Sequence, residues 1–192
     1  LRLTKSLAIP VALSELELTR RMGELAARNT GVEQAVCFLG GGAYDHFIPA
    51  VVDSLASRGE FYTSYTPYQP EVSQGNLQVM FEYETLICQL TGMDVSNASL
   101  YDGATAMIEA VLLAMASSPN KTRVVVPDSL HPHYHQVLET YLQWTQFELQ
   151  TVACPDGVLP SDAWSAALDD SVGCVVLSQP NFFGIVEDLA AA

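Results

Sequence analysis

Three short apolar stretches decide the fold: Arg123-Val-Val-Val-Pro127, Glu148-Leu-Gln-Thr-Val-Ala153 and Cys174-Val-Val-Leu177. Each contains β-branched residues and has the length of a buried strand. The segments between them, 130–145 and 161–168, have the longer amphipathic pattern of helices. Strands that alternate with helices predict a parallel sheet with helices on both faces, and therefore an α/β fold.

Upstream of this region the pattern is mainly helical. Ser14 and Glu17 have the spacing of a capping box at the start of a helix. We expect helices over residues 14–29, 45–57 and 75–91. In the longest of them, five apolar residues recur at helical spacing and are expected to form its inner face. These residues are Leu77, Met80, Phe81, Ile87 and Leu90.

The composition and the ends of the chain indicate a part of a longer protein. Of the residues, 49% are hydrophobic and only 16% are charged, so we expect a partner or further sequence to cover some of the surface. The chain opens on Leu1 rather than Met and stops at Ala192, directly after an expected strand and loop. We expect a helical segment with an inter-subunit or active-site loop over 1–92, and the first, incomplete part of an α/β domain over 93–192.

Charge and cysteine usage narrow the classes of partner. The net charge is −14 with eight lysines and arginines, which argues against nucleic acid and against anionic membranes. No apolar run reaches the length of a membrane span. The cysteines are far apart without a CxxC pair, which is typical of buried, reduced thiols in a cytoplasmic protein. They are Cys37, Cys88, Cys154 and Cys174.

Residues 59–76 form a dense polar-aromatic tract, Gly-Glu-Phe-Tyr-Thr-Ser-Tyr-Thr-Pro-Tyr-Gln-Pro-Glu-Val-Ser-Gln-Gly-Asn. Tyrosine and glutamine offer flat surfaces and hydrogen bonds to a small polar ligand, and prolines stiffen the chain. The pattern favours a functional loop. The alternative is a loop that packs on a neighbouring subunit.

Two loops are candidates for ligand binding, because ligands of such folds bind beyond the carboxyl ends of the strands. Residues 99–105 lead into a helix expected over 104–117, whose first N–H groups could hold a phosphate. A helix cap formed by Asp102 explains this pattern equally well. Residues 178–184 follow the last strand, and Asn181 could bind a ligand edge or belong to a plain turn.

A third loop, residues 128–135, contains three histidines at alternate positions. On a helix His131 and His135 share a face and His133 points away, so a metal site is disfavoured. We expect His131, at the helix start, to stack on a flat ligand instead.

Several catalytic classes lack their motif. No Lys-Ser or Lys-Thr follows Gly40-Gly-Gly42, as a P-loop requires, and no GxSxG occurs for a serine hydrolase. The chain has two lysines. Lys5 lies near the N-terminus, and Lys121 precedes a strand at the edge of the sheet opposite the expected ligand side. Neither is placed to form a Schiff base, so the lysine of any aldimine cofactor must come from elsewhere.

Four stretches resemble a known family in sequence and in order: 38–50, 60–75, 90–106 and 180–184. They read FLGGGAYDHFIPA, EFYTSYTPYQPEVSQG, LTGMDVSNASLYDGATA and PNFFG. With them the chain resembles the P-protein family of the glycine cleavage system, glycine dehydrogenase (decarboxylating). Within the family it is most similar to subunit 1 of the two-subunit form.

The resemblance implies an α/β, aminotransferase-like domain of a fold type I pyridoxal phosphate enzyme. Its parallel-rich sheet would be flanked by helices and truncated at both ends here. The implied activity is that of an oxidoreductase in glycine catabolism: decarboxylation of glycine and transfer of the aminomethyl group to the lipoyl-bearing H-protein. The implied assembly is a cytoplasmic heterotetramer with P-protein subunit 2, which holds pyridoxal phosphate on its own lysine.

The resemblance also assigns residues. The part of the tract that would reach into the partner's active site comprises Tyr62, Tyr65, Pro67, Tyr68, Gln69 and Glu71. The positions of a degenerate cofactor pocket would be Asp102, Gly103, Thr105, His131 and Asn181. Two alternatives stay open: a self-sufficient pyridoxal phosphate enzyme whose lysine lies beyond residue 192, and a structural subunit without a catalytic role.

Overall fold

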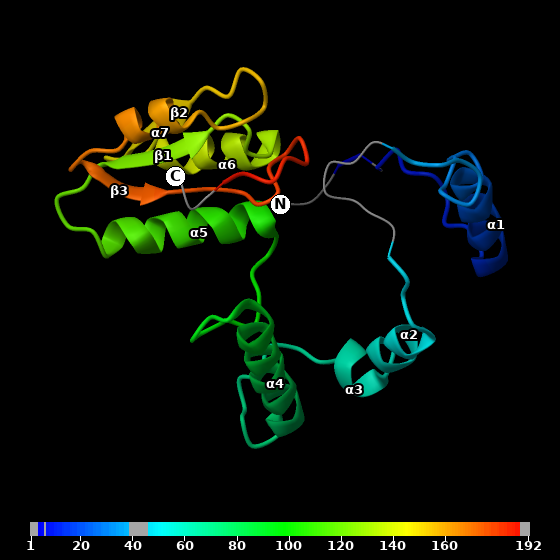
Figure 1. Cartoon of the computed structure of the whole chain (residues 1–192). Coiled ribbons are helices and arrows are strands. Elements are labelled where there is room, and N and C mark those ends of the chain that lie inside the picture. Colours follow the sequence, from blue (N-terminus) through cyan, green and yellow to red (C-terminus); the bar gives the residue numbers. More distant parts are fainter. Residues whose placement is uncertain (1–3, 6, 39–45, 189–192) are drawn as a thin grey trace. The chain divides into compact units, whose positions relative to one another are not determined.

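The computed structural model describes residues 4–5, 7–38 and 46–188 (Figure 1). The chain separates into two compact units, Leu1–Asp45 and His46–Ala192, and each is described by itself. The glycine run 40–42 and Asp45, which the sequence marks as a break and a helix start, lie outside the described residues. The boundary expected at residue 92 stays a prediction.

The first unit contains helix α1, Glu15–Ala26. The expected capping box is confirmed: the Glu17 amide donates to Ser14 Oγ, and the Ser14 amide donates to the Glu17 carboxylate at 2.9 Å. The helix ends three residues before the expected residue 29. Among the described residues of this unit, Leu25 is the one that is even partly covered.

The second unit begins with three helices, α2 (Ala50–Ala56), α3 (Gly59–Tyr62) and α4 (Gln74–Thr91). The expected helix start near residue 45 is wrong for the described residues 46–49, which are not helical. Pro49 has the extended conformation of a cap, and a residue before proline disfavours the helical region. Helix α4 is confirmed.

The expected inner face of α4 is not buried. Leu77 and Met80 are 37% and 40% exposed, and Leu90 is 82% exposed. Phe81 is also exposed, while Ile87 is partly covered. The helical spacing of these residues is real, but no described part of the chain covers them. Within the described residues, no helix is long and apolar enough to cross a membrane.

Strands β1 (Arg123–Pro127), β2 (Glu148–Val152) and β3 (Val172–Val175) form a parallel sheet in the order β2-β1-β3. Arg123 pairs with Glu148, and this register continues to the pair Pro127–Val152. β3 begins two residues before the expected residue 174 and ends at Val175. Its pairing with β1 continues one residue further, because the Val176 amide donates to Val125 O. The expected parallel α/β arrangement is confirmed.

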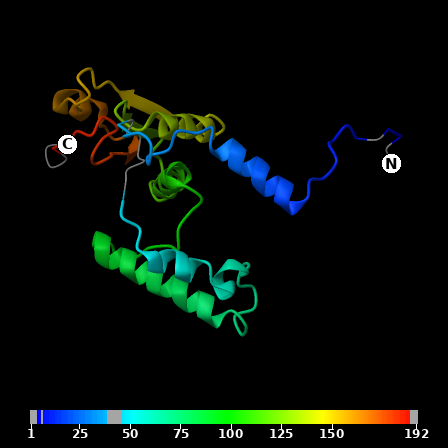
Figure 2. The ribbon, with the colours of Figure 1, turned by 90° about the vertical axis from the view of Figure 1, so that its right-hand side faces the viewer.

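Helices cover both faces of this sheet. The helices are α5 (Gly103–Ala116), α6 (Pro132–Leu142) and α7 (Ser161–Ala167). Helices α5 and α6 pack with Val124 and Val126 on one face. On the other face α7 packs against Val125 through Trp164. Figure 2 shows α5 end-on beside the sheet. The four cysteines of the sequence are free thiols, but the expected burial holds for Cys154 alone: Cys88 and Cys174 are partly buried and Cys37 is exposed.

Parallel strands place their carboxyl ends at one edge. The loops that follow β1, β2 and β3 therefore meet there, together with the N-termini of α5 and α6. Lys121 lies at the opposite edge, because a side chain at Gly173, near the start of β3, would contact its Cβ. The position predicted for Lys121 is confirmed.

We expect Leu138→Ala to lower the free energy of unfolding by about 2–5 kcal/mol, because Leu138 on α6 is fully buried in the core and the change leaves a cavity. Leu113→Ala on α5, where the side chain is 70% exposed, should cost less than about 1 kcal/mol. Urea unfolding of the intact protein measures both. Equal costs for the two variants would contradict the described core.

Candidate active-site region

The N-terminus of α5 is closed by a second capping box. The Asp102 carboxylate accepts the Thr105 amide and the Thr105 hydroxyl, both at 2.8 Å, and the Asp102 amide donates to Thr105 Oγ1. The hydrogen bond from the Thr105 amide holds the pKa of Asp102 below its ordinary value. The carboxylate is therefore charged at neutral pH, as the capping interpretation of this loop requires.

Gly103, the first residue of α5, lies under the side chain of Tyr134. A Cβ atom at Gly103 would lie 2.0 Å from the Tyr134 hydroxyl oxygen and 2.9 Å from Cζ. Tyr134 lies in the first turn of α6, next to the loop after β1. The absence of a side chain at Gly103 thus makes room for a tyrosine of the same chain.

His131 caps α6 and joins an aromatic cluster. Its Nδ1 accepts the amide of His133, and its ring centroid lies 5.1 Å from that of Tyr134. On another side the Phe182 ring packs edge-on against it at 4.9 Å. The cluster brings the loops after β1 and β3 together at the carboxyl edge. The ring stacking predicted for His131 is thus made by residues of this chain.

His135 points to a different partner. Its Nε2 is 2.8 Å from Thr151 Oγ1, and its Nδ1 is 3.3 Å from the Glu139 carboxylate. Across residues 4–5, 7–38 and 46–188, no group of three or more His, Cys, Asp or Glu side chains is arranged to hold a metal ion.

Asn181 is buried and fully hydrogen-bonded within the chain. Its side-chain amide donates to Gly157 O at 2.7 Å and to Glu187 Oε1 at 2.6 Å. Its oxygen accepts the amides of Phe183 and Ile185. The side chain therefore shapes a turn, which is the alternative that the sequence left open for this loop.

Glu187 completes this buried network. Its carboxylate also accepts the Leu159 amide, at 3.3 Å from each oxygen. The Gln179 side-chain oxygen accepts the Glu187 amide at 2.9 Å, and the Gln179 side-chain nitrogen donates to Glu187 O at 3.0 Å. We call Gln179, Asn181 and Glu187 the buried clasp, after its two buried members, Asn181 and Glu187; Gln179 itself is exposed. The clasp fixes the 178–188 segment against the loop after β2, and so sets the position of Phe182.

The tyrosine tract lines a pocket of its own, made by α3, the loop after it and the start of α4. A cavity of about 530 Å³ is bordered by Glu60, Tyr65, Tyr68, Gln69 and Asn76, among others. The rings of Tyr65 and Tyr68 are 6.4 Å apart. Both are exposed, at 83% and 77%. Tyr62, Pro67 and Glu71, the other predicted tract residues, are not among those that border this cavity.

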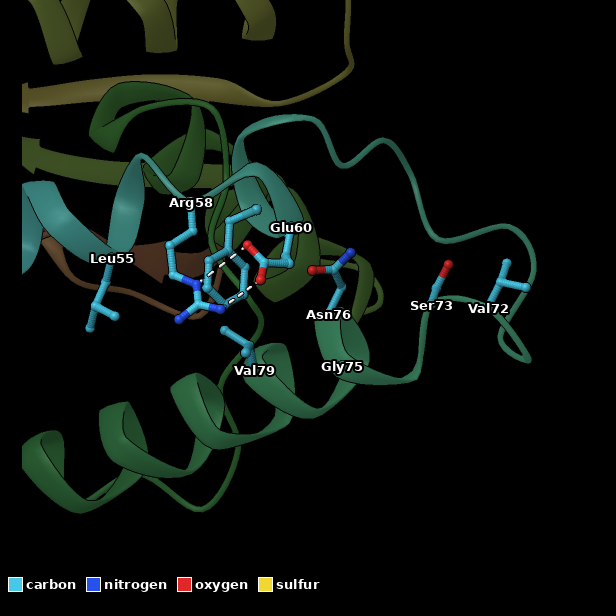
Figure 3. Close-up of a pocket in the computed structure, with 9 residues that line it drawn as sticks. Leu55, Arg58, Glu60, Val72, Ser73, Gly75, Asn76 and Val79 are labelled. Atoms are coloured by element: carbon cyan, nitrogen blue, oxygen red, sulfur yellow. Dashed lines mark hydrogen bonds and ion pairs between the residues drawn. The ribbon is translucent and has the colours of Figure 1, made fainter.

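Glu60 borders this cavity and also a neighbouring one, in which it forms an ion pair with Arg58 (Figure 3). Arg58 binds Glu60 with two nitrogens, Nη2 at 2.6 Å and Nε at 3.3 Å. These hydrogen bonds lower the pKa of Glu60 to about 2, so the pair stays charged over the physiological range. The second cavity, about 540 Å³, is bordered by both residues and by Leu55, Phe61 and Val79, among others.

Sequence reasoning missed Arg58, Tyr134 and Glu187. Arg58 and Glu60 flank Gly59, and opposite charges two residues apart at a helix start were a usable signal. Tyr134 lies three residues after His131, one helical turn away, and was also within reach. Glu187 left no local signal, because its partners are the Leu159 amide, 28 residues away, and the side chains of Gln179 and Asn181 across a turn.

The parallel sheet, its two helical layers and the loops at its carboxyl edge define part of an aminotransferase-like α/β domain. The whole chain, residues 1–192, matches the family model described as glycine cleavage system P-protein. The chain belongs to the glycine cleavage system P-protein family. The resemblance found in the sequence is thereby confirmed.

Individual relatives agree with this family. The chain is 50% identical over 189 residues to "Probable glycine dehydrogenase (decarboxylating) subunit 1" of Desulforamulus reducens, and 48% identical over 190 residues to the protein of that name from Geobacillus kaustophilus. These matches cover 98% and 99% of this chain but 42% of each relative. The chain thus spans less than half the length of these relatives.

A solved structure has the same fold. The crystal structure of glycine decarboxylase (P-protein) of the glycine cleavage system, in inhibitor-bound form, matches with a TM-score of 0.88 and 43% identity. The match covers 98% of this chain and 42% of that chain. The expected aminotransferase-like α/β class is confirmed.

We expect Asn181→Asp to lower the free energy of unfolding by at least about 2 kcal/mol, because a second carboxylate would face Glu187 and two buried N–H donors would be lost. Asn97→Asp is the matched control: the Asn97 side-chain oxygen is exposed and accepts the Ser99 amide, as an aspartate would. Urea unfolding of the intact protein compares them. Equal stability of the two variants would contradict the buried clasp.

Proposed function

We propose that this chain is part of a P-protein subunit 1 that acts in glycine decarboxylation, with transfer of the aminomethyl group to the lipoyl arm of the H-protein. Its tyrosine tract, residues 59–76, contributes to the active site of a partner, subunit 2. The observation that carries the proposal is the exposed cavity of the tract, in a chain that matches the family over its whole length.

The chemistry of the tract suits a small polar substrate. The phenol groups of Tyr65 and Tyr68 and the amide of Gln69 border one cavity with exposed, uncommitted surfaces. Tyrosine hydroxyls and a glutamine amide can donate to a carboxylate such as that of glycine. The Arg58–Glu60 pair supports the start of the tract, because Glu60 borders both cavities. The tract would therefore orient the substrate.

The family's enzymes use pyridoxal phosphate, and the residues of this chain do not fit it. The hydroxyl of Tyr134 covers Gly103, the Asp102 carboxylate caps the helix that would receive a phosphate, and Asn181 is fully bonded within the chain. Lys121 lies at the far edge of the sheet. These features support a cofactor held by subunit 2. The cytoplasmic heterotetramer of the two subunits is proposed from the family resemblance alone.

We expect Tyr65→Phe and Tyr68→Phe each to reduce kcat/KM for glycine decarboxylation about 5- to 13-fold, because each removes one hydrogen bond worth about 1–1.5 kcal/mol. The assay uses the intact protein reconstituted with subunit 2 and H-protein. Tyr141→Phe, a partly exposed tyrosine on α6 outside the tract, should be without effect.

Sedimentation of the same mixtures shows whether each variant still assembles. Activity that is unchanged in both tract variants, with normal assembly, would make the subunit a scaffold without a catalytic role.

We expect the intact protein alone to give no aldimine absorbance with pyridoxal phosphate and no adduct after borohydride, because Lys121 lies at the edge of the sheet opposite the carboxyl edge. Adding subunit 2 should produce both the absorbance and glycine decarboxylation, with the adduct on subunit 2. An adduct on a lysine of this protein would instead show a self-sufficient enzyme whose lysine lies beyond residue 192.

A further inference from the structure

The N-terminus of α5 is the place where this fold would receive the phosphate of a ligand, and a side chain of the same chain covers it. An anion binds a helix N-terminus through the first free N–H groups, and it must approach the backbone closely. At Gly103 this approach is taken by Tyr134, whose hydroxyl oxygen lies 2.0 Å from the position of a Cβ. The Tyr134 side chain thus occupies the space that the ligand would fill.

The polar groups of this helix start are also committed. The Thr105 amide and the Thr105 hydroxyl both donate to the Asp102 carboxylate at 2.8 Å. Two of the donors that a phosphate could use are therefore bonded already. The carboxylate also places a negative charge against any incoming anion, at the end of the helix where the dipole would otherwise attract one.

Tyr134 is held in this position by its neighbour His131, on which a residue of a second segment packs. His131 packs on its ring at 5.1 Å, and Phe182 packs on His131 at 4.9 Å. Phe182 is fixed in turn. Its amide donates to Ser129 O at 3.0 Å, and its neighbour Asn181 belongs to the buried clasp. Tyr134 is also partly buried against the core on the α5–α6 face. A ligand would have to displace a packed side chain.

We propose that Tyr134 and Asp102 together close this site, so that the chain excludes a phosphate monoester. Tyr134 acts by occupying the space over Gly103, and Asp102 acts by charge and by holding the donors of Thr105. The inference rests on the proposed function, in which subunit 2 holds the cofactor, and it names the residues that keep the cofactor out of this chain.

The test measures binding of inorganic phosphate to the intact protein without subunit 2, by equilibrium dialysis. The wild type should bind no phosphate at millimolar concentration. We expect the double variant Asp102→Ser/Tyr134→Ala to bind phosphate at least tenfold more tightly than the wild type does. Serine keeps the helix cap without the charge, and alanine uncovers Gly103. Each single variant should gain less than the double variant.

Controls separate the closed site from general effects. Asp102→Ser/Tyr141→Ala replaces another tyrosine of α6 and should gain no more than Asp102→Ser alone. Circular dichroism and urea unfolding confirm that each variant is folded. If the double variant with alanine does not fold, Asp102→Ser/Tyr134→Leu keeps apolar volume without the hydroxyl and serves in its place.

A second pair of probes tests the ligand class. Pyridoxal phosphate should follow inorganic phosphate in its gain of affinity for the double variant, and pyridoxal without the phosphate should not. A folded double variant that gains no phosphate affinity, or a wild type that binds phosphate equally well, would overturn the inference.

These outcomes differ from a failure of the proposed function. That failure appears as a borohydride-trapped adduct on this protein, or as tract variants with full activity. Neither result depends on phosphate binding by the Tyr134 variants.

Discussion

The arrangement of this chain depends on the burial of strand β1 from both sides. Val124 and Val126 face α5 and α6, while Val125 faces α7 and Trp164. A strand with apolar side chains on both faces is stable only in the middle of a sheet that carries helices on both sides. β1 is accordingly the central strand, paired in parallel with β2 and β3. The loops after β1, β2 and β3 are gathered at one edge as a result.

Local signals in the sequence were sufficient for most of the elements. The capping boxes at Ser14 and Asp102 and the αL glycine at Gly92 satisfy the end groups of their helices through residues a few positions away. Such contacts are visible in sequence because they are short in sequence. The helix start expected near residue 45 is wrong, although its cause is also local. Pro49 disfavours the helical conformation for the residue before it, so the helix begins after Pro49.

Contacts between distant segments were not predictable in this way. The spacing in α4 identified a helix and its apolar side, but spacing carries no information about which surface covers that side. At the carboxyl edge, Asn181 could equally be a ligand contact or a turn residue, and the difference is made by Glu187 and by the carbonyl of Gly157. The role of Gly103 likewise depends on Tyr134, about thirty residues away, and both belong to helix starts whose proximity only the fold reveals.

The uneven distribution of buried residues has a consequence for biosynthesis. Helices α1 to α4 contain no buried residue, and the buried residues of the described chain all lie beyond residue 100. Because synthesis proceeds from the N-terminus, the ribosome releases helices α1 to α4, with their exposed apolar side chains, before α5. At about 5–20 residues per second, the roughly 85 residues from α5 to the clasp follow over something on the order of 5–15 s. Side chains such as Phe81 and Leu90 stay exposed even when this stretch is complete, because no described residue covers them. They remain available to holdase chaperones and to neighbouring nascent chains until a partner or further sequence covers them, so the aggregation-sensitive stage of this protein's life lasts until that contact forms.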